Sequence, residues 1–320
     1  MMHARAPRCD AVPVATVETL DLFVPGENGL RAAFAPEANM VLHSLTLGGR
    51  ELLAQRNGLA AYVESGSTMG VPLLHPWANR LSGYGYTAAG TTVALDQDSE
   101  LFKRDEGGLP IHGALPSLCR WEVVDTGTGG DTASLVARLE WDRRHPAFEL
   151  FPFPHRLEYR ARITGGAIEI AVALEPTEEA PVPVSFGFHP YLSIPGGTRA
   201  GAEITLPAGR HLLLDASMIP TGETESCDPG LRQLGDASWD DGFSELAEPV
   251  RFLLGGRDGE TALMFVQGYR FAQVFAPPGS DFVCFEPMTA PTNALVAGGP
   301  NLTVVEPGGR HEAAFAIAAR

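Results

Sequence analysis

Alternation of apolar and polar residues with a period of two dominates this chain. Residues 155–163 alternate without a break, the turn Thr164-Gly165-Gly166 follows, and residues 167–174 alternate again. Two such segments on either side of a Gly-Gly turn predict a β-hairpin. We expect its apolar face to anchor a buried sheet. That face consists of Leu157, Tyr159, Ile163, Ile168, Ile170, Val172 and Leu174.

Shorter apolar or alternating runs recur along the rest of the chain, separated by clusters of Gly, Pro, Asn and Asp. We expect strands over residues 40–47, 92–95, 133–141, 202–206, 250–254 paired with 261–266, 271–275, 282–286, 302–306 and 312–318. No segment shows a long helical period. Many short strands at this spacing predict an all-β sandwich or barrel rather than a βαβ fold.

The chain shows no fixed-period repeat and no low-complexity linker, which favours a single domain over residues 15–320. Residues 1–14 mix Arg, His and Pro with small residues, and we expect a disordered leader there. This segment lacks the apolar core of a signal peptide, and no apolar run is long enough to span a bilayer. A cytoplasmic location is the prediction.

Composition narrows the function classes. Hydrophobic residues make up 44% and charged residues 19% of the 320 residues, as in ordinary globular proteins. The net charge of −16 disfavours nucleic-acid partners and anionic membranes, because both need clustered Lys and Arg. The four cysteines are scattered, which argues against a zinc ribbon or a disulfide framework and fits a reducing compartment. They are Cys9, Cys119, Cys227 and Cys284.

Motifs for nucleotide binding, for a serine nucleophile and for a zinc protease are absent from the sequence. The candidate catalytic and binding residues are therefore isolated polar residues in apolar surroundings. His189 lies within the segment Phe186–Tyr191, where aromatic rings on both sides offer flat faces that could stack on a sugar. An imidazole titrates near neutral pH, so this setting suggests proton transfer on a carbohydrate. The segment alone favours the alternative, a core histidine bonded to a backbone carbonyl.

Glu286 is the candidate base. It follows the apolar run 282–285, and Pro287 is expected to end the strand immediately after it. Partial desolvation at such a strand end raises the pKa of a carboxyl and makes it a better base near neutrality. A strand-end glutamate in a salt bridge is the equally supported alternative.

Asn79 and Arg80 end the segment 71–78, in which two prolines and a tryptophan favour extended or loop structure. The guanidinium could donate to sugar hydroxyls or hold a carboxylate. Alternatively, Arg80 is structural and bonds backbone carbonyls.

Two further segments could supply polar groups. His112 follows the turn Gly107-Gly108-Leu109-Pro110 and is either catalytic or a loop histidine that caps the turn. Asp240 and Asp241 precede Gly242, and either could accept hydrogen bonds from sugar hydroxyls. A solvated turn is the usual role of such an Asp-Asp-Gly sequence.

Taken in chain order, these pieces resemble the aldose 1-epimerase (galactose mutarotase) family, in a divergent branch. The elements that carry the resemblance are Asn79-Arg80, Ile111-His112-Gly113, Phe188-His189-Pro190-Tyr191, Asp240 with Phe243, and Phe285-Glu286-Pro287. Residues 35–41 are also similar to the first strands of that family. The resemblance implies an antiparallel β-supersandwich and an isomerase without metal or organic cofactor. It also implies an open polar cleft for a monosaccharide, in a monomer or homodimer.

The resemblance also implies roles for individual residues. Glu286 would be the general base that removes the C1 hydroxyl proton, and His189 the general acid that protonates the ring oxygen, a sugar ring's width away. His112 would hold the ring-oxygen side. Arg80 would orient the sugar or a catalytic partner, Asn79 would bind the sugar, and Asp240 would accept hydrogen bonds from its hydroxyls.

Departures from the best-known galactose mutarotases leave the sugar open. Those enzymes carry a polar Asn-His-Ser context around the acid, whereas this chain has Gly187-Phe188-His189-Pro190. Residues 287–293 also differ from the glutamine-containing version, and Asp241 could take the place of Asp240.

Three other functions remain. One is a non-catalytic monosaccharide-binding or sensor protein on the same fold. Another is a glycoside hydrolase. Glycoside hydrolysis usually needs two carboxylates that flank the scissile bond, and Glu286 is the single candidate in a suitable sequence context. The third is a cupin-like metal enzyme, disfavoured because its candidate ligands lack compact spacing. Those ligands are His43, His75, His112 and His189.

Overall fold

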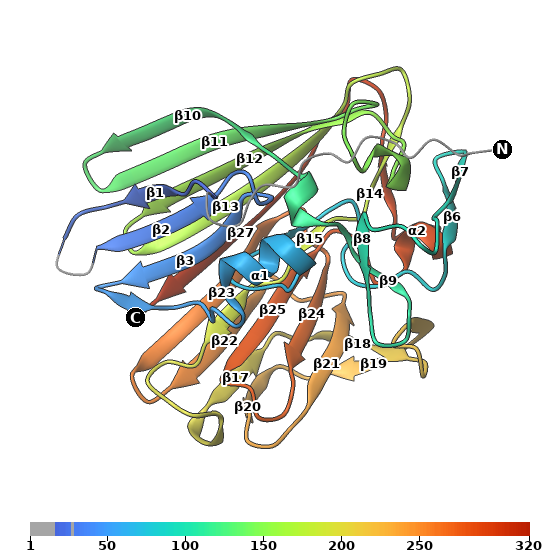
Figure 1. Ribbon diagram of the computed structural model, residues 1–320. Coiled ribbons are helices and arrows are strands. Elements are labelled where there is room, and N and C mark those ends of the chain that lie inside the picture. Colours follow the sequence, from blue (N-terminus) through green and yellow to red (C-terminus); the bar gives the residue numbers. More distant parts are fainter. Residues whose placement is uncertain (1–16, 27–28) are drawn as a thin grey trace.

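The computed structural model describes residues 17–26 and 29–320, and antiparallel β-strands make up most of it (Figure 1). The predicted leader, residues 1–14, lies outside the described residues. Two large sheets form the body of the molecule. The nine-stranded sheet has the order β10-β11-β12-β13-β27-β23-β22-β17-β20, and the eight-stranded sheet β19-β18-β21-β24-β25-β15-β5, with β16 also paired to β25.

The strands of the nine-stranded sheet are β10 (Glu122–Gly129), β11 (Thr132–Trp141), β12 (His155–Thr164), β13 (Ala167–Pro176), β17 (Glu203–Leu206), β20 (Gly230–Gln233), β22 (Arg251–Gly256), β23 (Gly259–Gln267) and β27 (His311–Ala319). Those of the eight-stranded sheet are β5 (Leu73–Leu74), β15 (Gly187–Phe188), β16 (Tyr191–Ser193), β18 (Gly209–Leu214), β19 (Pro220–Cys227), β21 (Trp239–Ser244), β24 (Phe271–Ala276) and β25 (Phe282–Met288).

Smaller sheets flank these two. One contains β1 (Leu20–Phe23), β2 (Leu30–Ala35), β3 (Val41–Leu47) and β4 (Arg50–Glu51). The others pair β6 (Gly85–Ala88) with β7 (Thr91–Ala94), β8 (Phe102–Arg104) with β9 (Pro110–Ala114), and β14 (Val182–Val184) with β26 (Thr303–Val305).

The predicted hairpin is β12 and β13, which pair in register from Thr164↔Ala167 to His155↔Pro176. Every residue of its predicted apolar face is buried. Each of the other predicted strands overlaps an observed strand, and β22 pairs with β23 as expected. The expected all-β antiparallel sandwich is therefore confirmed.

Aromatic side chains join the two large sheets across the core. The Phe188 and Phe315 rings, on β15 and β27, have centroids 5.0 Å apart, and those of Phe252 and Phe285, on β22 and β25, are 5.1 Å apart. Burying one such side chain contributes roughly 1.5–3 kcal/mol. Phe186 and Phe188 are fully buried in this core, so the expectation that these two rings face a sugar is wrong.

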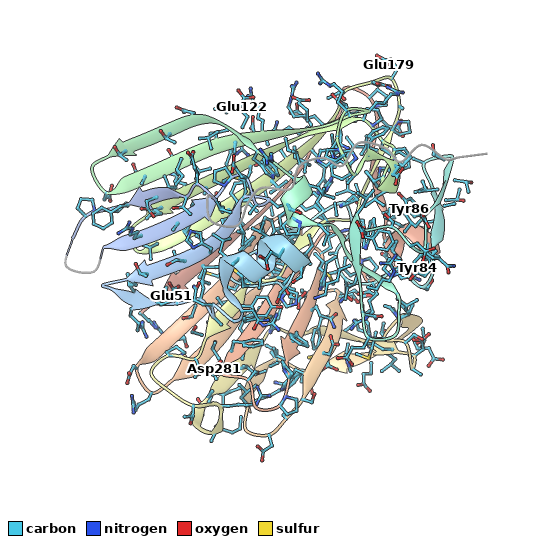
Figure 2. All side chains as sticks on the ribbon, in the orientation of Figure 1. Glu51, Tyr84, Tyr86, Glu122, Glu179 and Asp281 are labelled. Carbon is cyan, nitrogen blue, oxygen red and sulfur yellow. The ribbon has the colours of Figure 1, made fainter. Side chains whose placement is uncertain are left out.

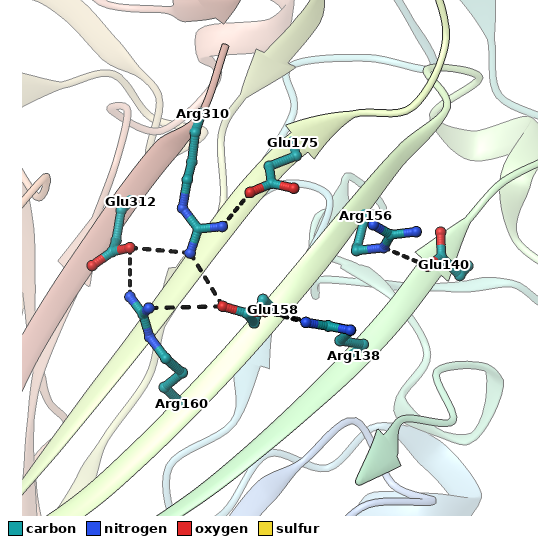
Figure 3. A network of polar contacts seen from close by, with 8 residues as sticks. All are labelled: Arg138, Glu140, Arg156, Glu158, Arg160, Glu175, Arg310 and Glu312. Atoms are coloured by element: carbon teal, nitrogen blue, oxygen red, sulfur yellow. Dashed lines mark hydrogen bonds and ion pairs between the residues drawn. The ribbon is translucent and has the colours of Figure 1, made fainter. Parts of the chain in front are cut away.

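The opposite face of the hairpin and of the neighbouring strands β11 and β27 carries charged side chains of both signs (Figure 3). Here Glu158 forms ion pairs with three arginines, at 3.1, 3.7 and 3.2 Å for Arg138, Arg160 and Arg310. We call this group the outer network. It consists of Arg138, Glu140, Arg156, Glu158, Arg160, Glu175, Arg310 and Glu312.

Helices are short and were not predicted: α1 spans Gly58–Ser65 and α2 Ala294–Ala297, with 3-10 turns at Pro116–Leu118, Phe148–Leu150 and Arg199–Gly201. An eight-residue helix covers too few turns for its period to stand out in the sequence. In the part of the chain that the structure describes, no helix combines the length and apolarity needed to cross a bilayer.

Candidate active site

All six predicted site residues line one cavity of about 140 Å³. Its walls come from the eight-stranded sheet, from β9 and from the loop before β6. This volume lies below the 300–1,000 Å³ that is typical for drug-sized ligands, so it suits a small molecule. The lining residues are Arg56, Asn79, Arg80, Ile111, His112, His189, Tyr191, Asp240, Phe275 and Glu286.

Strand register brings His189 and Glu286 together. Gly187 on β15 pairs with Met288 on β25, and Tyr191 on β16 pairs with Cys284, so His189 lies opposite Glu286 between these pairs. Glycine is required at 187, because a Cβ there would lie 2.8 Å from the carbonyl oxygen of Pro287. Strand β25 continues through Pro287 to Met288, so the expected strand end at Glu286 is wrong. Proline is compatible with extended backbone and removes a single N–H donor.

The imidazole and the carboxyl are in contact: His189 Nε2 lies 3.2 Å from Glu286 Oε1. Both side chains are buried, with residue exposures of 5% and 1%. The expected separation of a sugar ring's width is therefore wrong, because the two residues occupy opposed positions on neighbouring strands.

Burial shifts the two groups in opposite directions. Desolvation raises the pKa of Glu286 well above its usual value, Asp240 raises it further, and Arg80 opposes the shift. Desolvation lowers the pKa of His189 well below its usual value, and His112 and Arg56 add to this effect. Both shifts favour the state in which the Glu286 carboxyl holds the proton and the His189 ring is neutral.

His112 stands beside the pair, with its ring 5.5 Å from that of His189 in an edge-to-face arrangement. It belongs to β9 rather than to a loop, so the hypothesis of a loop histidine that caps a turn is wrong. Its φ of 66° is unusual for histidine, and Gly113 follows with φ 72° where a Cβ would lie 2.3 Å from the His75 carbonyl oxygen. Burial, together with Arg80 and Lys103, lowers the pKa of His112 to about 3, so its ring is neutral at pH 7.

The turn before β9 is anchored from both sides. Asp105 Oδ1 accepts a hydrogen bond from the Leu109 N–H at 2.8 Å. The hydroxyl of Tyr84, a residue that is labelled in Figure 2, donates to the carbonyl oxygen of Gly108. These contacts fix the start of the strand that presents His112.

Arg80 is held by carboxylates and not by backbone carbonyls, so the latter hypothesis is wrong. Its Nε donates to Asp105 Oδ2 at 2.8 Å, and its Nη1 donates to Asn79 Oδ1 at 3.1 Å. Its Nη2 lies 3.8 Å from Asp240 Oδ2 on the other side. The guanidinium therefore bridges the β8–β9 turn to β21 and fixes the orientation of Asn79.

Asp240, and not Asp241, lines the cavity, and it lies on β21 rather than in a solvated turn. Its Oδ1 accepts a hydrogen bond from Gln273 Nε2 at 2.7 Å. Burial raises the pKa of Asp240, with opposing contributions from Gln273 and Arg80. Asp241 instead lies 2.9 Å from His211 Nε2.

Several residues that line or support the cavity were not predicted from the sequence. Gln273 was detectable as a lone amide inside the apolar run 271–275, and its register partner on β25 is Glu286. Arg56 lies in a polar turn that gives no signal by itself, and Phe275 reads as an ordinary strand residue. Its ring meets the imidazole of His189 edge-on at 5.7 Å.

Three buried polar atoms of the site have no hydrogen-bond partner among the described residues: His112 Nδ1, His189 Nδ1 and Glu286 Oε2. Buried polar groups are nearly always paired, so this cluster fits a site for a polar ligand. Within the described ranges, no group of three or more His, Cys, Asp or Glu side chains could hold a metal ion.

Comparison with known proteins assigns the family. The sequence profile of the aldose 1-epimerase family matches residues 41–317. The chain belongs to the aldose 1-epimerase family. No curated protein sequence matches it.

Solved structures share the fold over nearly the whole chain. The Slr1438 protein from Synechocystis sp. PCC 6803 is 23% identical, with 99% of each chain covered and a TM-score of 0.77. A galactose mutarotase-like protein from Clostridium acetobutylicum is 13% identical, with 97% of each chain covered and a TM-score of 0.80. The GalM/aldose epimerase homologue from C. elegans is 15% identical, with 95% of this chain and 99% of that chain covered and a TM-score of 0.71.

Proposed function

We propose that this member of the aldose 1-epimerase family interconverts the α and β anomers of an aldose by general acid–base ring opening and closure. The observation that carries the proposal is the buried His189–Glu286 contact inside a small cavity lined with polar side chains. Perturbed titratable groups in such a setting are typical of catalytic acids and bases.

The reaction uses the two groups in complementary roles. The Glu286 carboxylate removes the proton from the C1 hydroxyl, while His189 Nε2–H protonates the ring oxygen. The bond between C1 and the ring oxygen breaks and the C1 carbonyl forms. After rotation about the C1–C2 bond, the two groups exchange roles and the ring closes to the other anomer.

The contact between the two groups is compatible with this chemistry. The C1 hydroxyl oxygen and the ring oxygen are bonded to the same carbon, so their acid and base act on atoms two bonds apart. A sugar whose C1 end meets the pair can therefore engage both side chains. The groups need not lie on opposite sides of the whole ring.

The opposed pKa shifts define the resting protonation state of the pair. In the free site the raised pKa of Glu286 and the lowered pKa of His189 favour a proton on the carboxyl. The catalytic state needs the same proton on the imidazole, 3.2 Å away. A positioned acid or base contributes roughly 10²- to 10⁴-fold in rate, and holding the sugar in place adds the orientation term.

Neighbouring residues supply the binding contacts. Neutral His112 contacts the ring-oxygen side, while Arg80 and Asn79 orient the sugar. Asp240, whose second oxygen Oδ2 lies only 3.8 Å from Arg80, accepts hydrogen bonds from sugar hydroxyls.

Polarimetry on pure anomers of glucose, galactose and other aldoses tests the proposal. We expect the protein to accelerate equilibration of at least one aldose at catalytic concentration. Calorimetry under the same conditions separates the alternative, a monosaccharide-binding or sensor protein. Binding without rate enhancement for every sugar that binds would support that alternative and overturn the enzyme.

A further inference from the structure

A second hollow, of about 460 Å³, adjoins the candidate active site at Arg56. Arg56 lines both this hollow and the catalytic cavity. Among the described residues that line the cavity, it is the one that is exposed to solvent, whereas the others are buried or half-buried. Its side chain therefore marks the mouth of the cavity and the border with the hollow, which we call the side pocket.

Strand pairing places the side pocket directly beside the wall of the cavity. The rings of Tyr191, which lines the cavity, and Phe282, which lines the side pocket, have centroids 5.0 Å apart. The guanidinium carbon of Arg56 lies 4.9 Å from the centre of the first ring and 5.7 Å from that of the second. Ser193 follows Tyr191 on β16, pairs with Phe282 and also lines the side pocket. Arg56 thus spans the aromatic edge between the two spaces.

The side pocket presents polar groups that are available to a ligand. Arg56 Nη1 donates to the Thr68 carbonyl oxygen at 2.8 Å and to the Tyr191 hydroxyl at 3.1 Å, and its Nε and Nη2 have no partner among the described residues. Asp281 and Ser193 line the same pocket, and within the described ranges neither side chain forms an ion pair or a hydrogen bond. Such donors and acceptors beside an aromatic edge match the hydroxyl groups of a sugar.

The dimensions favour a ligand that is longer than one sugar ring. In the proposed function, the cavity of about 140 Å³ holds one ring whose C1 end meets the buried pair of His189 and Glu286. The far end of that ring then faces the exposed Arg56. Along β25, Glu286 and Phe282 are four residues apart, about 13 Å at the rise of a strand. This separation matches the length of a disaccharide rather than that of a single ring.

The charge of the side pocket favours a neutral ligand over an anionic one. Among the described residues that line it, Arg56 is the single cation and Asp281 the single carboxylate, so the charges balance. A phosphate group would meet the guanidinium but would also approach the carboxylate, and like charges repel. Neutral hydroxyl groups accept from the guanidinium and donate to the carboxylate at the same time.

We propose that the side pocket binds the second residue of a neutral reducing disaccharide or oligosaccharide, whose reducing-end aldose occupies the catalytic cavity. This inference rests on the proposed function and names its substrate class. Arg56 and Asp281 bind hydroxyl groups of the second residue, and Ser193 adds a contact at its edge. The glycosidic bond stays intact, because only the reducing end undergoes ring opening.

Reducing disaccharides compared with glucose test the proposal in the wild-type protein. Maltose, cellobiose and lactose each have glucose at the reducing end, so they differ from glucose only in the added residue. We expect polarimetry to give a KM about tenfold lower for at least one of them, the effect of one or two additional hydrogen bonds. KM values for all three that equal or exceed the KM for glucose overturn the proposal.

Asp281→Asn is the diagnostic variant, because it removes the charge at an exposed position and keeps the size of the side chain. We expect it to raise KM for the preferred disaccharide about 3- to 10-fold more than KM for glucose. Asp98→Asn, the same substitution at an exposed position in the turn before β8, is the matched control and should leave the ratio of the two KM values unchanged. Equal rises for both sugars in Asp281→Asn contradict the proposal.

Glucose 6-phosphate distinguishes the anionic alternative. A KM for this sugar below that for every disaccharide, lowered further by Asp281→Asn, overturns the proposal in favour of an anion site. A KM that Asp281→Asn does not lower, together with preference for a disaccharide, supports the neutral ligand.

Saturation-transfer NMR adds a readout that does not depend on turnover. Irradiation of the protein should transfer saturation to protons of both rings of the preferred disaccharide. Transfer confined to the reducing-end ring overturns the proposal even when the wild type is active on glucose. A wild type that accelerates none of these sugars overturns the proposed function itself, so the two failures are distinguishable.

Discussion

Two glutamates on neighbouring sheets show how location decides the behaviour of the same side chain. Glu158 belongs to the outer network, where partial burial raises its pKa but hydrogen bonds from Arg138 and Arg310 outweigh this, and the net pKa is lowered. Glu286 is fully buried, and its pKa is raised well above the usual value.

The two glutamates differ in pKa because they differ in their cationic partners. Glu158 forms direct ion pairs with three arginines at the solvent boundary, whereas the direct partner of Glu286 is a histidine whose own pKa is lowered. Arg80, the guanidinium that lowers the pKa of Glu286, is already bonded to Asp105. A carboxyl without a permanent cationic partner can accept and release a proton, whereas one held among arginines stays ionised.

The largest expected effect comes from removing the carboxylate of the buried pair. Glu286→Gln keeps the shape of the side chain and eliminates the base, so we expect kcat to fall roughly 10²- to 10⁴-fold. The matched control is Glu158→Gln, the same substitution in the outer network, which should retain wild-type kcat. A loss of less than tenfold in Glu286→Gln, measured by polarimetry, would contradict the role of base.

Asp240→Asn should give a smaller and different change. Its oxygens are aligned by Gln273 and Arg80, so we expect weaker hydrogen bonds to sugar hydroxyls and a KM about tenfold higher. Asp241→Asn is the matched control, because Asp241 pairs with His211 outside the cavity lining. Steady-state kinetics of both variants decide this, and an equal rise in KM would refute the assignment.

The two glutamates should also affect stability with opposite dependence on pH. Below pH 4.5 the Glu286 carboxyl is protonated in both the folded and the unfolded chain. As pH rises, the unfolded chain ionises while the folded chain keeps the proton, so the wild type loses stability relative to Glu286→Gln. The slope is about 1 kcal/mol per pH unit while this difference persists.

Glu158 has a lowered pKa in the folded protein, so the sign reverses. The wild type should gain stability relative to Glu158→Gln as pH rises through the folded pKa towards 4.5, and this gain should persist above it. His189 contributes separately, because its lowered pKa makes the protein lose stability as pH falls below about 6.5. Comparing each variant with the wild type by urea unfolding between pH 3 and 7 isolates each glutamate. If the stability difference between wild type and variant changed with pH in the same direction for both variants, the opposite pKa shifts of the two glutamates would be contradicted.

The smallest effect concerns the outer network at fixed pH. We expect Glu158→Gln to lower the free energy of unfolding at pH 7 by about 1 kcal/mol or less, since ion pairs near solvent contribute little. The difference should shrink at high ionic strength, where exposed charges are screened. Chemical denaturation in low and high salt measures it, and a salt-independent loss of several kcal/mol would be inconsistent with a solvent-screened network.

Alternation along the chain predicted the sandwich well where one face of a long strand is buried, as in β11 and β12. In β12 and β13 the side-chain period fixes which residues enter the core, and local sequence is sufficient. It failed for α1, which is too short to show a period, and for Phe186 and Phe188. Both rings are fully buried, and Phe188 packs on Phe315 of β27 in the core.

The site was predicted as a set of residues but not as a geometry. Short motifs pointed to His189, Glu286 and Asp240, yet the direct contact within the pair depends on strand register between segments about a hundred residues apart. Arg56 and Thr68 contact Tyr191 from the segments before and after α1, and no local pattern marks them. Contacts between segments so far apart in the chain depend on the tertiary structure, so local sequence patterns cannot predict them.

The most direct test of the central claim is the rate of anomer exchange, measured by magnetisation-transfer NMR for a panel of aldoses with wild-type protein and Glu286→Gln side by side. The buried pair predicts that the wild type accelerates exchange of at least one aldose, and that the variant returns it close to the rate in buffer. Identical rates for wild type, variant and buffer with every aldose would contradict it.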